Sequence, residues 1–353
     1  MRYTFLSTLP GETDFERFES VPRDVYPYYH RQVAQKNQYN PDYLHAAIVL
    51  VGDEQPVGRV AVYLNPYLEV EGKPAAAIGN YECIDSDEAS RLLLGKALEV
   101  IAEAGMHYVI GPFNGSVWDE YRFVSSPAAP NYFLEPFNPL YYNRQFKAFG
   151  FGEAARFVSH LDQDVQSVDP KAEAQLAHFK ARGLRFRSVD LDRYEAELRT
   201  MHAFCMENFK GTWLFTPVSW EAWRARYLPI KDYIDPRFVV IAEDEQGETL
   251  GIIYCLRDYL HYQDYWLVSV LLARKQDPAW AGLGRVLVHE MFARVREAGF
   301  DAIIHAFMRE EDLARLKTTV MGGEHYRTYM LYGMPVPAGF RLAPEMQELV
   351  AAG

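Results

Sequence analysis

The residues best suited to chemistry are a closely spaced glycine pair, Gly282-Leu283-Gly284, in the second half of the chain. The pair stands between a segment with a strand pattern and one with a helix pattern. A Gly-x-Gly turn at that point exposes backbone N–H groups at a helix N-terminus, which favours a phosphate or pyrophosphate. A Rossmann turn is disfavoured because Leu287 stands where its third glycine should be, and the lack of a following Gly-Lys-Ser/Thr excludes a P-loop. A glycine pair that only permits tight packing between helix and strand is the alternative.

The segments around the glycine pair follow the order strand, loop, helix, strand. Residues 265–273 are β-branched and apolar, as in a buried strand, and residues 274–281 form a loop. After the glycines, apolar residues recur at helical spacing up to Gly299, which suits a helix C-terminus. Residues 300–307 form a second strand. This order places the glycine turn at one end of a buried strand.

Composition and charge narrow the class of protein. The chain has 353 residues, 49% hydrophobic and 24% charged, as expected of a globular protein large enough for two domains. The net charge of −12 argues against a nucleic-acid partner but leaves room for a local basic patch around an anionic substrate. No run of about 18 apolar residues predicts a membrane span, and the N-terminal apolar run is too short for a signal peptide, so we expect a cytoplasmic protein. The three cysteines lie far apart, and no metal site is expected.

The two halves of the chain repeat one pattern. Strand patterns in both halves surround an Asp-Glu-Gln turn, at residues 53–55 and again at 244–246. An Ala-Gly helix end preceded by Glu occurs at residues 103–105 and again at 297–299, at nearly the same distance from the preceding turn. We interpret this as a tandem duplication of one α/β unit. Two unrelated α/β domains with similar turns are the alternative.

The repeat sets the expected domain boundaries. We place one unit at residues 1–163 and the other at 183–345, joined by a linker over 163–183 that carries Asp164, Asp169 and Pro170. The segment 114–138 has no counterpart in the second half. Because long loops inside compact domains are often functional, this insertion is a candidate for a binding role.

Three short motifs add to the repeat: Gly111-Pro-Phe-Asn-Gly-Ser116, Asn138-Pro-Leu-Tyr-Tyr142 and Tyr326-Arg-Thr-Tyr329. With the order of elements, they resemble the GNAT N-acetyltransferase family in its two-domain bacterial form. The family's pyrophosphate loop, (Gln/Arg)-x-x-Gly-x-(Gly/Ala), corresponds to residues 279–284. Both glycines match, whereas Ala279 replaces the basic or amide residue. The resemblance implies an α/β chain of two tandem GNAT units, each a mixed, mostly antiparallel sheet flanked by helices.

The resemblance also implies an acyl donor, acetyl-CoA or another acyl-CoA. In GNAT folds, strands 4 and 5 splay apart, and pantetheine pairs with strand 4 like an added strand. Strand 4 corresponds to residues 265–273 here. The residues expected to contact the donor are Leu271, Leu272 and Ala273 on this strand, and Trp280, Ala281, Gly282, Leu283, Gly284 and Arg285 at the pyrophosphate loop.

The family's catalytic residues are only partly present. The position of its acid Tyr is occupied by Thr318, so the alternatives for the general acid are water, Tyr326 or Tyr329, or no acid at all. His305, on the strand after the glycine helix, is a candidate base, with a histidine of the core or rim as the alternative.

The first half lacks the glycine loop. Its equivalent carries Asp85, Asp87 and Glu88, and three carboxylates at a helix start would repel a pyrophosphate. We therefore expect the first half to shape the acceptor site, with core packing as the alternative for its two adjacent tyrosines. The residues expected to bind the acceptor are Asn114, Asn138, Tyr141, Tyr142 and Trp213.

Together these features predict an acyl-CoA-dependent N-acyltransferase, with acetyl as the expected group. The amine of a small molecule would attack the thioester directly. We expect a monomer or a homodimer. A non-catalytic protein that binds CoA or another ligand, and a transferase with a different acyl donor, remain the alternatives. Neither the acceptor nor the length of the acyl chain follows from the sequence.

Overall fold

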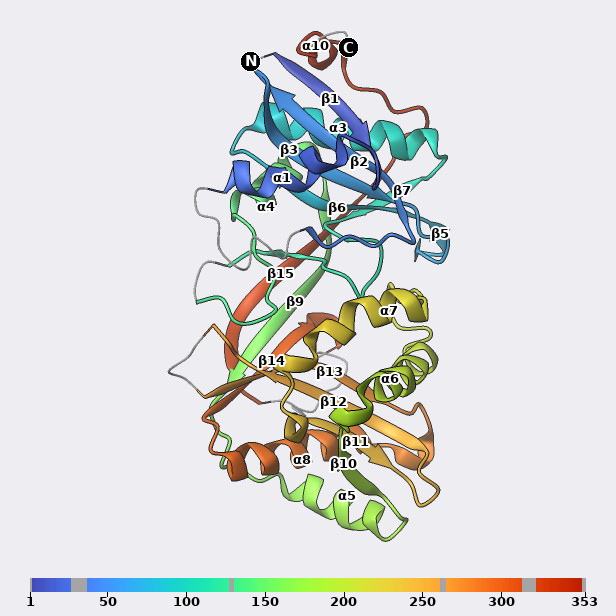
Figure 1. Cartoon of the computed structure of the whole chain (residues 1–353), viewed down its shortest axis with the longest axis vertical. Coiled ribbons are helices and arrows are strands. Elements are labelled where there is room, and N and C mark those ends of the chain that lie inside the picture. The colour runs from blue at the N-terminus through green and yellow to red at the C-terminus, as the bar shows by residue number, and fades with distance from the viewer. Residues whose placement is uncertain (1, 27–36, 127–129, 261–264, 313–321, 351–353) are drawn as a thin grey trace.

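The computed structural model describes residues 2–26, 37–126, 130–260, 265–312 and 322–350 (Figure 1). The first half contains strands β1 (Tyr3–Thr8), β2 (Leu44–Gly52), β3 (Gln55–Tyr63), β4 (Glu69–Val70), β5 (Lys73–Pro74), β6 (Ala76–Cys83), β7 (Tyr108–Gly111), β8 (Phe123–Val124) and β9 (Gly152–Asp162), and helices α1 (Phe15–Val25), α3 (Asp87–Glu103) and α4 (Tyr141–Phe149). The second half contains helices α5 (Pro170–Lys180), α6 (Tyr194–Asn208), α7 (Trp220–Tyr227), α8 (Leu283–Ala298) and α10 (Pro344–Gln347), and strands β10 (Arg185–Ser188), β11 (Val239–Glu243), β12 (Thr249–Arg257), β13 (Trp266–Arg274), β14 (Ala302–Arg309) and β15 (Glu324–Pro335).

One sheet of 13 strands runs through both halves. Its order is β1-β2-β3-β6-β7-β15-β9-β14-β13-β12-β11-β10, with β8 on the side of β15. Among the described residues, β6 with β7 and β13 with β14 are the parallel pairs, and the other neighbours are antiparallel. Each parallel pair needs a crossover connection, which α3 and α8 provide. The predicted α/β class with a mixed, mostly antiparallel sheet is confirmed.

The last strand of each half completes the sheet of the other half. β15 pairs with β7, where Tyr332 lies opposite Gly111, and β9 pairs with β14, where Asp162 lies opposite Ile303. β9 and β15 also pair with each other, and Figure 1 shows the two strands as the bridge between the halves. The halves are therefore joined by exchanged strands as well as by the chain between them. The unit boundaries given above stay a prediction.

Helices cover both faces of the sheet in the second half (Figure 1). On one face, α8 buries the apolar side chains that its helical spacing predicted, Val286, Leu287, Met291 and Val295. It ends at Gly299, which takes the left-handed conformation (φ 74°) that a helix C-terminus requires. On the other face, α6 and α7 enclose an aromatic cluster against β11 and β12. No helix within the described part of the chain is long and apolar enough to cross a membrane.

Candidate active site

The strands β13 and β14 separate partway along their length. They pair in parallel from Trp266 opposite Ala302 to Ser269 opposite His305. Beyond this point β13 continues along β12 only, and β14 continues along β9. Among the described residues, the backbone of β13 beyond Ser269 therefore lacks a strand neighbour on that side. We call this opening the β13–β14 fork.

The glycine pair lies at the end of α8 that meets β13. Gly282 takes a φ of 98° before the first residue of the helix, and no side chain in the described part of the chain caps that end. The N–H groups of Leu283 and Gly284 precede the first hydrogen bonds of the helix, which Arg285 and Val286 donate to the carbonyl of Gly282. The start of α8 therefore has the free backbone donors that favour an anion.

The two glycines have different surroundings. A Cβ at Gly282 would clash with the Gln175 side chain of α5, so Gly282 permits the close packing that was the alternative for the pair. A Cβ at Gly284 would lie 3.5 Å from Cδ of Arg274 and 3.9 Å from Cδ2 of Leu272, which is ordinary contact. Gly284 therefore faces the end of β13, where the donor was predicted to lie.

Other residues predicted for the pyrophosphate loop contact α5 and the residues on either side of it. Arg285 forms an ion pair with Asp169 at 2.6 Å. Trp280 is buried against Phe179, and the guanidinium of Arg182 lies 4.5 Å from the centre of its indole. Arg274, which the sequence analysis did not select, supplies a cation beside Gly284 and has no ion-pair partner among the described residues. The sequence feature that could have identified Arg274 is its position at the end of a strand, shortly before a glycine turn.

The β13–β14 fork opens onto a cavity of about 670 Å³, which we call the large cavity. Val270, Leu271 and Leu272 of β13 and Ala306 and Phe307 of β14 line it. Its walls are mostly apolar. The aromatic side chains that line it are Trp118, Tyr121, Phe133, Phe137, Phe157, Phe209, Trp213, Phe215, Trp223, Tyr227, Tyr233, Tyr254 and Phe307.

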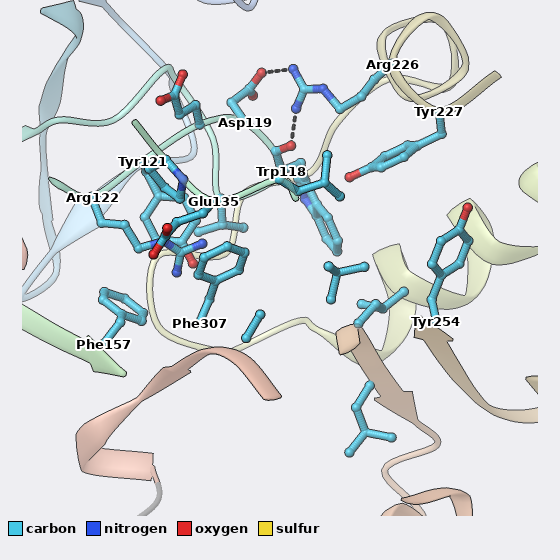
Figure 2. A pocket seen from close by; sticks show the side chains of 18 of the residues that line it. Trp118, Asp119, Tyr121, Arg122, Glu135, Phe157, Arg226, Tyr227, Tyr254 and Phe307 are labelled. Atoms are coloured by element: carbon cyan, nitrogen blue, oxygen red, sulfur yellow. Dashed lines mark hydrogen bonds and ion pairs between the residues drawn. The ribbon is translucent and has the colours of Figure 1, made fainter. Parts of the chain in front are cut away.

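The insertion over residues 114–138 supplies one wall of the large cavity. Residues 117–122 and 133–137 line it, together with α6 and the segment 209–215 of the second half. Figure 2 shows Tyr121, Arg122 and Phe307 gathered at one end and Tyr254 at the other. The loop that stood out in the sequence for having no counterpart thus supplies most of the first-half residues that line the large cavity.

Strained backbone gathers at this cavity. Eight non-glycine residues in the described part of the chain have positive φ, and four of them line the large cavity: Arg122 (73°), Leu134 (67°), Leu214 (58°) and Phe307 (61°). Such conformations cost of order 1–3 kcal/mol each and persist where the surroundings enforce them, most often at functional sites. Phe307 sits at the irregularity between His305 and Met308 in the pairing of β14 with β9.

A buried polar cluster lies in the wall of the large cavity around Glu135. Oε1 of Glu135 accepts hydrogen bonds from Nε of Arg327 at 2.9 Å and from the hydroxyl of Tyr329 at 2.7 Å. Burial raises the pKa of Glu135, while Arg327 and Tyr329 act in the opposite direction. Burial also raises the pKa of Tyr329 well above its usual value, so its hydroxyl stays protonated and can donate.

The predicted catalytic residues lie in different places. Tyr329 belongs to the Glu135 cluster, and Tyr326 donates its hydroxyl to the carbonyl of Pro130 at 2.8 Å. His305 is buried on the α8 side of the sheet, where its ring stacks on Phe292 with the centroids 6.0 Å apart. It does not line the large cavity. Thr318 lies outside the described residues. The catalytic roles of these four residues stay predictions.

The predicted acceptor residues divide between the two halves. Trp213 lines the large cavity beneath the guanidinium of Arg309, which is 4.2 Å from its ring centre. Asn138 accepts a hydrogen bond from the N–H of Val124 at 2.8 Å. The hydroxyl of Tyr141 donates to the carbonyl of Cys83 at 2.8 Å, and that of the fully buried Tyr142 to Glu82 at 2.8 Å.

The corresponding opening in the first half is filled. β6 and β7 pair at Ala76 and Ala77 and then separate, as β13 and β14 do. Here Oδ1 of Asn114 accepts a hydrogen bond from the N–H of Asn80 at 2.8 Å, taking the backbone donor that an added strand would need. The space left beside Asn114 is about 20 Å³, which suits one water molecule.

The start of α3 is also closed to an anion. The hydroxyl of Ser86 caps it by accepting from the N–H of Ala89 at 3.2 Å, and Asp87 and Glu88 occupy its first turn. An acidic first turn and a capped helix end disfavour a bound phosphate. The two halves therefore share a fold but differ at the site where a donor would bind.

Comparison with solved structures identifies the fold. A GNAT protein from Sphaerobacter thermophilus superposes with a TM-score of 0.51 at 13% identity, covering 96% of this chain and 98% of the other. A tandem GNAT protein from the clavulanic acid biosynthesis pathway gives 0.51 at 11% identity, with 95% and 99% covered. The glucosamine N-acetyltransferase region of a fungal multi-domain GH3 β-N-acetylglucosaminidase gives 0.56 at 16% identity, where this chain is 95% covered but spans only 38% of the other.

The chain therefore has the GNAT fold twice in tandem, and that prediction is confirmed. No family model matches the sequence. A curated relative, the bacterial ceramide synthase of Caulobacter vibrioides, is 22% identical over 268 residues, which is 71% of this chain and 70% of the relative.

Proposed function

We propose that the protein is an acyl-CoA-dependent N-acyltransferase whose reaction takes place in the second half of the chain. The observation that carries the proposal is the direct connection between the β13–β14 fork and the large cavity. At the outer end of β13, Gly284 and Arg274 provide anion-binding groups. Beyond the fork, the large cavity provides an apolar space of about 670 Å³ for the reacting groups.

The donor would bind along β13. Pantetheine would pair with the open edge of the strand beyond Ser269, because an extended amide chain there gains the hydrogen bonds of an added strand. The pyrophosphate would contact the N–H groups of Leu283 and Gly284, with Arg274 as the neighbouring cation. The thioester would then lie at the point where the two strands separate.

The reaction would be a direct transfer. The amine nitrogen attacks the thioester carbon, the new C–N bond forms, and the C–S bond breaks as the thiolate of CoA leaves. A backbone N–H of the open strand edge is suited to hold the oxyanion of the intermediate. The amine proton leaves to solvent or to a nearby base, and the thiolate takes up a proton.

The large cavity supports an apolar substrate. Thirteen aromatic side chains line it, and the burial of an alkyl chain gains about 0.8 kcal/mol for each CH₂ group. A lipid chain and an aromatic amine both suit such a space. The similarity to a ceramide synthase, an enzyme named for a long-chain amide, favours the lipid chain. We therefore propose a long-chain group on the acyl donor, on the amine, or on both.

Release of free thiol from CoA thioesters tests this proposal. Acetyl-CoA and octanoyl-CoA are each offered with octylamine, a sphingoid base, benzylamine and an amino fatty acid, whose carboxylate represents an acidic acceptor. We expect thiol release that depends on the amine and is fastest with a long-chain partner. A Met201→Trp variant, which narrows the α6 wall of the large cavity, should lower the rate with octanoyl-CoA more than with acetyl-CoA. No amine-dependent release with any pair would contradict the proposal.

A further inference from the structure

Arg122 is a buried cation that lies between the large cavity and the first-half opening. Only 8% of the residue is exposed, and it lines both spaces. Its backbone has a φ of 73°, and its N–H donates to the carbonyl of Pro112 at 3.0 Å. The side chain is therefore held at the wall by a constrained backbone.

Three aromatic rings surround the guanidinium of Arg122. Its central carbon lies 3.8 Å from the ring centre of Tyr121, 4.2 Å from that of Phe307 and 4.9 Å from that of Phe157 (Figure 2). Rings attract the face of a guanidinium, but they do not accept the N–H groups along its edge as an oxygen does. The rings fix the plane of the group and leave its donors available.

Two of the three guanidinium nitrogens of Arg122 lack a hydrogen-bond partner among the described residues. Neither Nε nor Nη1 has a hydrogen-bond partner within the described part of the chain, and both are buried. Two other guanidinium groups that line the large cavity are paired, Arg226 with Asp119 and Arg309 with Glu311. Arg122 has no such carboxylate among the described residues.

A buried and unpaired guanidinium is costly, and it cannot be relieved by loss of the proton because arginine stays charged in proteins. The adjacent Nε and Nη N–H groups match the two oxygens of a carboxylate or a phosphate. A ligand that brings such a group to this wall would supply the missing charge and the missing acceptors together.

We infer that Arg122 is a specificity-determining residue that binds an anionic oxygen group, carboxylate or phosphate, on the acceptor. Phe307, on which the guanidinium stacks, belongs to β14 at the β13–β14 fork, so the anion would be held close to the point of acyl transfer. The acceptor class is then an amine that carries both an apolar body and an acidic group. This inference adds a substrate class to the proposed function. It rests on the proposed function because only an acyltransferase would use the bound anion as its acceptor.

The test compares three probes with the same chain and different head groups: octanoate, octyl phosphate and 1-octanol. Each is titrated into the full chain by calorimetry. We expect octanoate or octyl phosphate to bind about tenfold more tightly than octanol, as a charge-assisted bidentate contact should provide. The tighter of the two anions identifies the oxygen group.

Variants assign the preference to Arg122. Arg122→Met keeps the stacked, apolar part of the side chain. We expect this variant to bind all three probes with the affinity that the wild-type chain has for octanol. Arg122→Lys should keep part of the preference, since an ammonium supplies charge without the planar pair of donors. Arg309→Met, a variant of a paired cation on the same cavity, is the matched control and should keep the full preference.

Two results would overturn the inference: equal binding of the three probes by the wild-type chain, or an anion preference that Arg122→Met retains. The melting temperature of Arg122→Met provides an independent readout. Because an unpaired charge is removed, it should stay level or rise, whereas a fall without any loss of anion preference would make Arg122 a structural residue. A titration with CoA separates the two proposals. Anion preference without CoA binding would contradict the acyltransferase proposal but would still support an anion site at Arg122.

Discussion

The hydroxyl of Tyr329 donates a hydrogen bond of 2.7 Å to Oε1 of Glu135, joining the last strand of the chain to the insertion of the first half. The same hydroxyl lies 2.7 Å from that of Tyr132. Since β15 also completes the first-half sheet, this contact connects the wall of the large cavity to the strand exchange. The stability of the cavity wall should therefore depend on a residue far from it in sequence.

Replacing Tyr329 with Phe should destabilise the fold. The change removes one donor from a buried carboxylate and one partner from Tyr132, so we expect a loss of about 1–3 kcal/mol in the free energy of unfolding by urea. Tyr326→Phe is the matched control on the same strand, where the lost bond to Pro130 lies nearer the surface and the expected loss is within about 0.5 kcal/mol. Equal losses of unfolding free energy in the two variants would show that the Glu135 cluster does not contribute more to stability than an exposed hydrogen bond. Thiol release by the two variants also tests each tyrosine as the general acid, and unchanged release by both would leave water or no acid.

Gly284→Glu should weaken CoA binding without unfolding the chain. A Cβ at Gly284 meets ordinary contacts, and the new carboxylate would face the predicted pyrophosphate. We expect calorimetry to give an affinity at least about tenfold lower, with an unchanged melting temperature. Gly284→Ala is the control and should bind CoA within about threefold of wild type. If Gly284→Glu binds CoA as tightly as wild type, the glycine turn is not part of the CoA site.

Gly282→Glu is a poorer probe of the same site. Its φ of 98° and its approach to Gln175 mean that any side chain strains the start of α8. We expect this variant to lose stability as well as CoA affinity, and a melting curve recorded beside the Gly284 variants separates the two effects. A Gly282→Glu chain that melts like wild type would contradict the packing role assigned to this glycine.

Arg274→Gln should weaken CoA binding about tenfold, because its guanidinium lies beside Gly284 and has no ion-pair partner among the described residues. The adjacent Lys275 is a suitable control, since its ammonium is already paired with Glu248 at 2.7 Å. Lys275→Gln should leave the affinity within about twofold. The effect should shrink as salt concentration rises, and equal effects of the two substitutions would argue against a specific role for Arg274.

The first half expressed alone should not fold cooperatively. Residues 1–163 lack β15, so β7 loses the strand that covers its edge and the first-half core loses Leu331 and Tyr332. We expect no sharp urea transition by circular dichroism for this fragment. The intact chain, in the same buffer, should unfold in a clear transition. A fragment that unfolds like a native domain would mean that the exchanged strand is dispensable.

Much of the fold was predictable because its signals are local. Helical spacing, the β-branched run before the glycine turn and the left-handed Gly299 each depend on a few neighbouring residues, and the structure bears them out. The insertion was recognisable because the repeat lacked a counterpart for it. The spacing of the motifs therefore predicted the tandem fold, and it indicated the loop that lines the large cavity.

The exchange of β9 and β15 was not predictable from the sequence. Neither strand has an apolar alternation that assigns it to one sheet, because β9 buries residues 157–159 and β15 buries residues 329–333 in succession. Arg122 and Arg274 were missed because their roles depend on distant segments, the rings of Phe157 and Phe307 in one case and the start of α8 in the other.

The side-chain directions on β14 were also beyond sequence reasoning. Strict alternation would place neighbouring residues on opposite faces, but the irregularity at Phe307 brings both Ala306 and Phe307 to the large cavity while His305 faces α8. A positive φ at a phenylalanine has no sequence signature. In the first half, the Gly-Pro-x-Asn motif was visible, but the contact of Asn114 with Asn80 was not.

A calorimetric titration of CoA, acetyl-CoA, hexanoyl-CoA and decanoyl-CoA into the full chain tests the central claim most directly. We predict one molecule bound per chain, because the first-half opening is filled, with an affinity that rises with acyl length as the chain enters the large cavity. Two molecules per chain, or an affinity that falls with acyl length, would contradict the assignment of the site. The absence of binding by every CoA compound would contradict the acyltransferase proposal itself.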